Sequence, residues 1–221
     1  MSDDAGLRDR LDRYVADLFA PEDDLLRDLR DEMARRGFPD IAVSASQGAL
    51  LGVLLAAVGA RRVLEIGTLG GYSAIWMARA LPAGGRLITL EVDPDRAAFA
   101  REFAARAGLD DRIDVRVGAA IESIRAMIDA GEAQFDACFI DADKENYPAY
   151  LDHAFELVRT GGLVLADNVF WNGRILDEDP PDEGTRAILE FNRRLATDER
   201  IRATLVPVRD GLAVGVVTSG T

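Results

Sequence analysis

The chain of 221 residues is 48% hydrophobic and carries a formal net charge of −13, which predicts a single domain over 1–221 and argues against a nucleic-acid or anionic-membrane partner. No apolar run of about 18 residues would span a membrane, and the charged N-terminal segment is unlike a secretory signal. With one cysteine, Cys138, and one histidine, His153, the composition excludes an internal disulfide, a His-based triad and a His-rich zinc site, and it favours a reducing, cytoplasmic setting.

Three helices are predicted before the first strand. Residues 7–19 and 22–36 place apolar side chains at helical spacing, as amphipathic helices do. The third helix, 47–59, is apolar on nearly every side and is therefore expected to be buried.

Short apolar strands then alternate with helices. The strands are expected at 62–67, 86–91, 112–117, 135–141 and 162–168, and the helices at 72–81, 94–107, 119–130, 147–158 and 184–196. This alternation predicts right-handed βαβ crossovers and a parallel sheet. Two final strands within 201–218, joined near Asp210–Gly211, form an antiparallel hairpin. We therefore expect N-terminal helices over 1–58 and an α/β core over 59–221.

The predicted fold is α/β, with helices on both faces of a mostly parallel, seven-stranded sheet that ends in the antiparallel hairpin. This Rossmann-like three-layer sandwich resembles the class I methyltransferases, because the hairpin is absent from the standard dinucleotide-binding arrangement.

A glycine loop follows the first strand, in "VLEIGTLGGYS". Gly67, Gly70 and Gly71 there allow a tight turn and the close approach of a ligand to the backbone. The spacing is G-x-x-G-G, not the G-x-G-x-x-G of dinucleotide enzymes, so a pyrophosphate site is poorly supported.

Three acidic residues lie near this loop. Glu91 ends the second strand, where its carboxylate can accept both hydroxyls of a ribose. Asp93 is the local alternative, but it precedes Pro94 and can simply begin the next helix. Glu65 lies within an apolar strand, so its burial would be costly without a partner. The cationic amino-acid end of S-adenosylmethionine could supply that partner.

Oxygen-bearing side chains end the fourth and fifth strands. Asp141 follows the fourth strand, and Asp167 and Asn168 follow the fifth. If these strands are neighbours, their carboxyl ends bring the three side chains together into an all-oxygen set suited to Mg²⁺. Asp143 and Glu145 are alternative ligands, and acidic strand ends are often only helix caps.

Lys144 is the only lysine among 26 basic residues, and it lies in "FIDADKENY". Lysine can lose its proton when it is desolvated, whereas arginine effectively cannot. A chain that uses arginine elsewhere therefore has a candidate general base at this position, although a solvated surface lysine is the alternative.

Four motifs, "VLEIGTLGGYS", "FIDADKENY", "ADNVFWNGRI" and "VRDGLAVGVV", resemble those of the cation-dependent O-methyltransferases of the caffeoyl-CoA and catechol type, in their small, bacterial form. The resemblance runs from about Val43 to Val217. It implies that Asp141, Asp167 and Asn168 bind Mg²⁺ or a similar cation and that Lys144 is the base.

The same resemblance implies where the methyl donor and the acceptor bind. The implied S-adenosylmethionine site is Val43 (through its backbone), Glu65, Gly67, Thr68, Ser73, Glu91, Ala120 and Asp141. Asp141 would serve both the donor and the metal. Lys144, Trp171 and Asn172 would border the substrate, a small phenol, and the enzyme would be a homodimer.

Two departures from the family pattern bear on these assignments. Gly70 stands where a threonine is common. The segment 177–183 is short and holds five carboxylates, which would repel the phosphates of a CoA thioester. We therefore expect a free catechol-like acceptor.

Two other functions fit parts of the sequence. A nucleotide-cofactor oxidoreductase would share the general sheet, but the loop spacing and the hairpin disfavour it. A non-catalytic S-adenosylmethionine-binding protein would need neither Lys144 nor the metal ligands, so we expect a metal-dependent O-methyltransferase.

Overall fold

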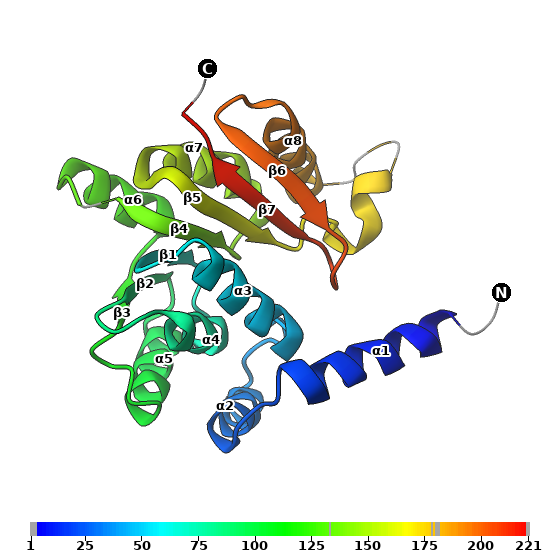
Figure 1. Cartoon of the computed structure of the whole chain (residues 1–221), viewed down its shortest axis with the longest axis vertical. Helices are drawn as coiled ribbons and strands as arrows, with labels where there is room; N and C mark the ends of the chain where they lie inside the picture. The colour runs from blue at the N-terminus through cyan, green and yellow to red at the C-terminus, as the bar shows by residue number, and fades with distance from the viewer. Residues whose placement is uncertain (1–3, 133, 178, 180–181, 220–221) are drawn as a thin grey trace.

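A seven-stranded mixed sheet with helices on both faces forms the body of the computed structural model, which describes residues 4–132, 134–177, 179 and 182–219. The strands are ordered β3-β2-β1-β4-β5-β7-β6, with β7 antiparallel to both of its neighbours and the other pairs parallel. Figure 1 shows the three layers and the C-terminal hairpin at one end of the sheet. The predicted α/β fold and its terminal hairpin are thus confirmed.

The element bounds follow the predicted alternation closely. The strands are β1 Arg62–Ile66, β2 Arg86–Glu91, β3 Ile113–Val117, β4 Phe135–Ile140, β5 Val158–Asp167, β6 Ile201–Val206 and β7 Leu212–Val217. The α-helices are α1 Asp4–Phe19, α2 Asp24–Arg35, α3 Ala45–Ala57, α4 Tyr72–Ala80, α5 Pro94–Arg106, α6 Ala120–Asp129, α7 Tyr147–Leu157 and α8 Glu183–Thr197. Two 3₁₀ turns, η1 Lys144–Asn146 and η2 Trp171–Leu176, follow β4 and β5.

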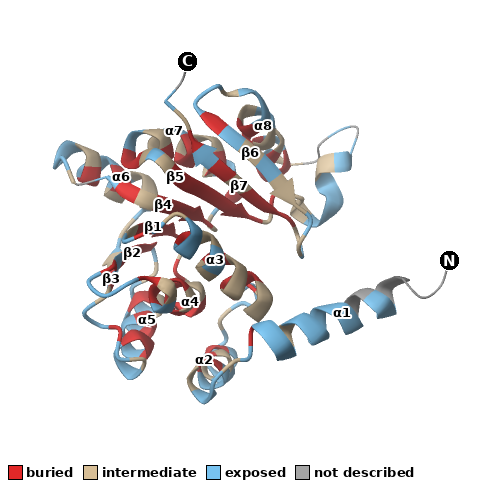
Figure 2. Ribbon diagram, in the orientation of Figure 1, coloured by how far each residue is buried: buried red, intermediate tan, exposed pale blue. Residues whose placement is uncertain are grey.

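The apolar strands bury their side chains alternately on the two faces of the sheet. Val63 of β1 and Phe139 of β4 pack with α2, α3, α4 and α5 on one face, whereas Leu64 and Cys138 pack with α6, α7 and α8 on the other. Burial on both faces explains why the strands are continuous apolar runs. Figure 2 shows the central strands buried along most of their length.

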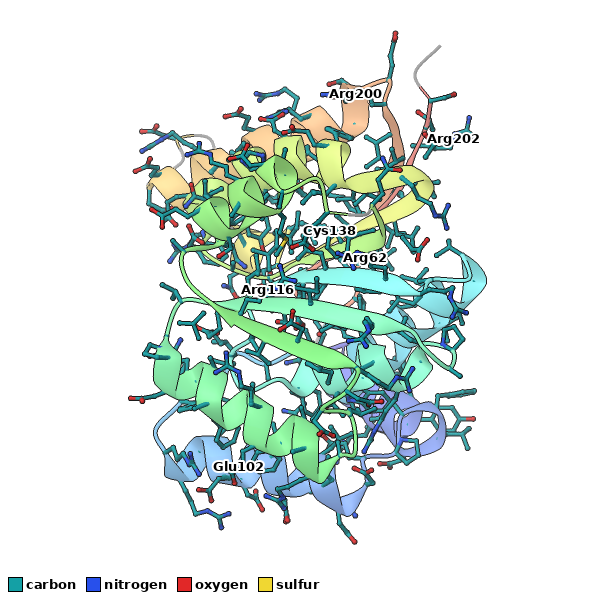
Figure 3. All side chains as sticks on the ribbon, turned by 90° about the vertical axis from the view of Figure 1, so that its left-hand side faces the viewer. Arg62, Glu102, Arg116, Cys138, Arg200 and Arg202 are labelled. Atoms are coloured by element: carbon teal, nitrogen blue, oxygen red, sulfur yellow. The ribbon has the colours of Figure 1, made fainter. Side chains whose placement is uncertain are left out.

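Cys138 lies inside the second of these cores, as the sequence predicts for a small apolar side chain. Burial raises the pKa of its thiol to about 12, so it is a poor nucleophile. Arg62 of β1 and Arg116 of β3 both pair with Glu132, which follows α6, each at 2.6 Å. Figure 3 shows both arginines against the strands.

The fifth strand differs from its predicted bounds. It begins at Val158 directly after α7, and not at Gly162, because the pairing with β4 passes through an irregularity between Phe135 and Ala137. A Cβ at Gly162 would lie 2.7 Å from the Asp136 carbonyl oxygen, so the glycine permits this close approach. In the sequence, two successive glycines instead suggest a turn.

The N-terminal helices form, but their burial departs from expectation. Helix α3 buries Gln47, Gly48, Leu51 and Leu55, while Val53 on its other side is 65% exposed. Helix α1 extends away from the sheet with most of its surface exposed (Figures 1 and 2). The predicted burial of the third helix is therefore found on one side of α3 only. No helix in the described part of the chain is both long and apolar enough to cross a membrane.

Candidate active site

A cleft of about 1790 Å³ opens at the carboxyl ends of β1, β2, β4 and β5. This is the edge where ligands bind in parallel sheets. The structure brings nearly all of the predicted site residues to the wall of this cleft. They are Val43, Gly67, Thr68, Ser73, Glu91, Ala120, Asp141, Lys144, Asp167, Asn168, Trp171 and Asn172.

The glycine loop is shaped by close packing. Gly67 has φ +99°, and a Cβ there would lie 2.0 Å from the carbonyl oxygen of Asp141. Gly71 has φ +83° at the start of α4. Gly70 has a different role, because a Cβ there would lie 2.4 Å from the sulfur of Met33. Its departure from the family's threonine thus makes room for a side chain of α2 behind the loop.

Glu91 joins the end of β2 to the glycine loop. Its Oε2 accepts a hydrogen bond from the Leu69 amide at 2.8 Å, and its Oε1 accepts one from the Asp93 amide at 3.0 Å. Each oxygen retains a lone pair for a further donor. Asp93 instead caps α5 by accepting from the amides of Asp95 and Arg96, as the alternative interpretation of its sequence position suggests.

Glu65 is the predicted donor-site residue that does not line the cleft. It is fully buried beneath Ser73, whose hydroxyl donates to its Oε1, and its Oε2 has no protein partner among the described residues. Burial raises the pKa of the Glu65 carboxyl to about 8. An unpartnered buried carboxylate oxygen is costly, so this group needs a cationic or donor partner to ionise.

Other expected donor contacts lie around the same wall. Val43 is buried at the cleft, and its carbonyl accepts from Arg30 Nη2 at 2.9 Å, so that oxygen already has a protein partner. Ala120 begins α6, and its N-cap residue Ala119 makes no side-chain capping bond. The first amides of α6 are therefore open to a ligand.

Asp141 and Asp167 meet because β4 and β5 are neighbours, with Ile140 paired to Ala166. Burial and the charge of Asp141 raise the pKa of the Asp167 carboxyl to about 6, and burial also raises the pKa of Asp141. Asn168 follows with φ +58°, a conformation that asparagine tolerates better than most residues. Two mutually repelling carboxylates beside an amide form a set that a divalent cation would stabilise.

The alternative ligand Asp143 is already engaged within the protein. Its Oδ1 accepts from the Tyr150 hydroxyl at 2.6 Å, and its Oδ2 accepts from the side-chain amide of Asn146. Among the residues that the structure describes, no three His, Cys, Asp or Glu side chains gather into a metal-binding group. Any cation here would therefore depend on two carboxylates, the Asn168 amide, and oxygens from water or substrate.

Lys144 is buried at the floor of the cleft, with 7% of its surface exposed. Its Nζ donates to the Tyr147 hydroxyl at 2.6 Å and lies 3.3 Å from Asp141 Oδ1. Tyr147 in turn donates to the backbone carbonyl of Asp167 at 3.0 Å. The ammonium is thus held between the two acidic strand ends, which excludes the alternative of a solvated surface lysine.

Trp171 and Asn172 form an unusual loop beside Lys144. Both have positive φ, at 47° and 54°, and the Trp171 ring centroid lies 5.7 Å from Lys144 Nζ. The Asn172 amide donates to Asp210 Oδ1 at 2.7 Å, which ties this loop to the β6–β7 turn. The turn therefore helps to fix one wall of the cleft.

Three residues with clear contacts were missed by sequence reasoning. Gln47 bonds to Asp167, Tyr147 bonds to Lys144, and Asp210 holds Asn172. Ser44-x-x-Gln47 does carry the signature of a capping box, but nothing in that signature points to a partner far along the chain.

The comparisons with known proteins identify the family of the chain. The O-methyltransferase family model matches residues 16–216. The chain is 42% identical to the catechol O-methyltransferase of Niastella koreensis over 94% of this chain and 96% of that protein. It is 33% identical to the caffeoyl-CoA O-methyltransferase of Eucalyptus gunnii over 93% and 86%.

A solved structure of an O-methyltransferase with its methyl donor bound has a similar fold. The O-methyltransferase TomG of Streptomyces achromogenes, in complex with SAM, superposes with a TM-score of 0.90 at 38% identity, covering 95% of this chain and 96% of that one. The chain belongs to the O-methyltransferase family, and it is an S-adenosylmethionine-dependent O-methyltransferase.

Proposed function

We propose that the enzyme moves the methyl group of S-adenosylmethionine to one hydroxyl of a small, free catechol-like phenol in a reaction that depends on a divalent cation. The observation that carries this proposal is the meeting of Asp141, Asp167 and Asn168 with the buried Lys144 at the floor of one cleft. The donor set is all oxygen, as Mg²⁺ prefers.

The residues present fit a cation, because the elevated pKa of Asp167 arises in part from the nearby charge of Asp141. A bound dication would offset that repulsion. Asp141, Asp167 and Asn168 would hold it, leaving further positions for two vicinal hydroxyls. When bound, it would bring those hydroxyls together and favour their ionisation.

The protein groups have separable roles in the transfer. The acceptor oxygen attacks the methyl carbon as the carbon–sulfur bond breaks, so the positive charge of the sulfonium is lost. Lys144, held by Tyr147 and Asp141, would take the phenolic proton as a neutral amine and become the ammonium. Trp171 would lie against the aromatic ring and keep the reacting atoms at about 3–3.5 Å.

Charge near the acceptor end favours a free phenol over a CoA ester. Asp177, Asp179 and Glu183 are exposed, while Asp182 caps α8 and pairs with Arg174 at 3.0 Å. Residues 178, 180 and 181 of this segment lie outside the described residues. Anionic side chains there would repel the phosphates of CoA.

A methyl-transfer assay over a matched panel tests the acceptor. Free catechols should be methylated once, whereas catechols whose second hydroxyl is already methylated, and CoA esters of the same ring, should react far more slowly. Efficient transfer to a simple monophenol would contradict the chelation of two hydroxyls, and a preference for the CoA ester would contradict the charge argument.

Glu91 provides a test of the donor site with a matched control. Glu91→Ala should weaken S-adenosylmethionine binding by about 1.5–3 kcal/mol, because the ribose would lose charge-assisted hydrogen bonds. Asp93→Ala, an acid two residues away that caps α5, should leave binding nearly unchanged. Titration calorimetry measures both, and a larger loss for Asp93→Ala would move the ribose contact to that residue.

We further propose that the enzyme is a homodimer that pairs through α1. Leu11, Tyr14, Leu18 and Phe19 are 54%, 61%, 58% and 68% exposed on this one helix. Isolated apolar side chains on a surface are ordinary, but a continuous apolar face is typical of an interface. A second copy is the simplest occupant, because closed twofold pairs are the commonest oligomers.

Light scattering at micromolar concentration should give a mass twice the 24.0 kDa of one chain. Leu18→Glu should shift the protein toward monomer, because it places a charge in the apolar face of α1. Val117→Glu is the control, since Val117 is also exposed but lies at the end of the edge strand β3, away from α1 (Figure 1). A monomeric mass for the wild type would reject the dimer.

A further inference from the structure

Gln47 is a buried polar residue that the proposed chemistry does not yet use. It is 3% exposed in the first turn of α3 and lines the cleft. Its Nε2 donates to Asp167 Oδ1 at 2.9 Å, across 120 positions of sequence. Buried side-chain amides are retained where their hydrogen bonds have a structural or functional purpose.

The orientation of the Gln47 amide is fixed from its other end. Its Oε1 accepts from the Ser44 amide at 3.1 Å, and its own backbone amide donates to Ser44 Oγ at 3.2 Å, which completes a capping box. Since Oε1 must face a backbone donor, Nε2 must face Asp167. The start of α3 thus holds a donor in place against β5.

This contact suits a carboxylate that has to bind a cation. Gln47 supplies the side-chain hydrogen bond that the Asp167 carboxylate accepts among the described residues, and Tyr147 holds the Asp167 backbone carbonyl. A neutral amide fixes Oδ1 without adding a positive charge that would repel a cation. A lysine or arginine at position 47 would satisfy the same oxygen but would compete with the metal.

We propose that Gln47 is a positioning residue that orients the Asp167 carboxylate toward the divalent cation. This inference rests on the proposed function, because it assumes that Asp167 is a metal ligand. Hydrogen bonds to metal-binding side chains commonly contribute 10–100-fold to metal affinity. A role in capping α3 alone would affect folding and leave metal affinity unchanged.

Mn²⁺ binding to the purified enzyme, measured by calorimetry and by electron paramagnetic resonance, separates these roles. Gln47→Met keeps the length of the side chain and removes both polar atoms, and it should raise the Kd for Mn²⁺ about 10–100-fold. Gln47→Ala should do the same if the methionine variant does not fold. Ser44→Ala is the control, since it removes the capping hydroxyl but leaves Gln47 beside Asp167.

The expected pattern is weaker Mn²⁺ binding in the Gln47 variants, a Ser44→Ala value within about twofold of wild type, and unchanged SAH affinity throughout. Wild-type Mn²⁺ affinity in folded Gln47→Met or Gln47→Ala would overturn the positioning role while leaving the metal site intact. Absence of Mn²⁺ binding by the wild type would instead overturn the metal dependence itself, and the inference with it.

Discussion

Replacing Lys144 with arginine is expected to lower the rate of methyl transfer by about 10²–10⁴-fold, the usual contribution of a general base. Arginine preserves the positive charge beside Asp141, but its guanidinium stays protonated and cannot accept the phenolic proton. The measurement is single-turnover transfer to a catechol at saturating donor and Mg²⁺. If Lys144→Arg keeps near wild-type turnover at neutral pH, Lys144 is not the base.

The buried setting of Lys144 calls for a control on packing. Its Nζ lies 2.6 Å from the Tyr147 hydroxyl. A bulkier guanidinium could therefore displace the neighbouring side chains and slow the reaction by distorting the site, without any effect on proton transfer. Lys144→Ala avoids that crowding and should be equally slow. Added alkylamines should restore part of its rate, as expected for a missing base, and should not restore the arginine variant.

Asp141→Ala and Asp167→Ala should each reduce Mg²⁺-dependent transfer by at least about 10²-fold, because residues that merely orient metal ligands already contribute 10–100-fold. Asp143→Ala is the matched control. It removes the same charge two residues away, but its carboxylate is held by Tyr150 and Asn146. A more severe loss from Asp143→Ala would show that the ligand assignment is displaced by two residues.

Stability without metal gives a second readout for Asp167. Its folded-state pKa of about 6 lies above its ordinary value of 3.8, so its ionisation destabilises the fold. Its contribution to the free energy of unfolding is greatest below about pH 4 and is lost as the pH rises through 6. In EDTA, Asp167→Asn should therefore weaken this pH dependence, and when Mg²⁺ is restored the variant should remain inactive. Denaturation curves at pH 4.5 and 7 would measure it.

Much of the fold follows from the sequence because buried strands and amphipathic helices leave regular patterns. The meeting of Asp141 and Asp167 follows from one topological assumption, that β4 and β5 are neighbours, and the structure confirms it. The hairpin near Asp210–Gly211 follows from turn chemistry, and Gly211 does take φ +84°.

The parts that were missed depend on tertiary contacts. The one-sided burial of α3 cannot be deduced from its composition, because its apolar residues include both the buried Leu55 and Val53, which is 65% exposed. A Cβ at Gly70 would lie too close to the side chain of Met33 in α2, and no local sequence pattern indicates this contact. The bond from Gln47 to Asp167 joins residues 120 positions apart, and no periodicity encodes such a pair.

Chelation of the enzyme during turnover tests the central claim most directly. The wild type should be freed of divalent cations with EDTA, assayed with S-adenosylmethionine and a free catechol, and then supplied with excess Mg²⁺. Transfer should fall to background in EDTA and return when Mg²⁺ is restored. Unchanged turnover in excess EDTA would remove the cation from the mechanism and contradict the roles assigned to Asp141, Asp167 and Asn168.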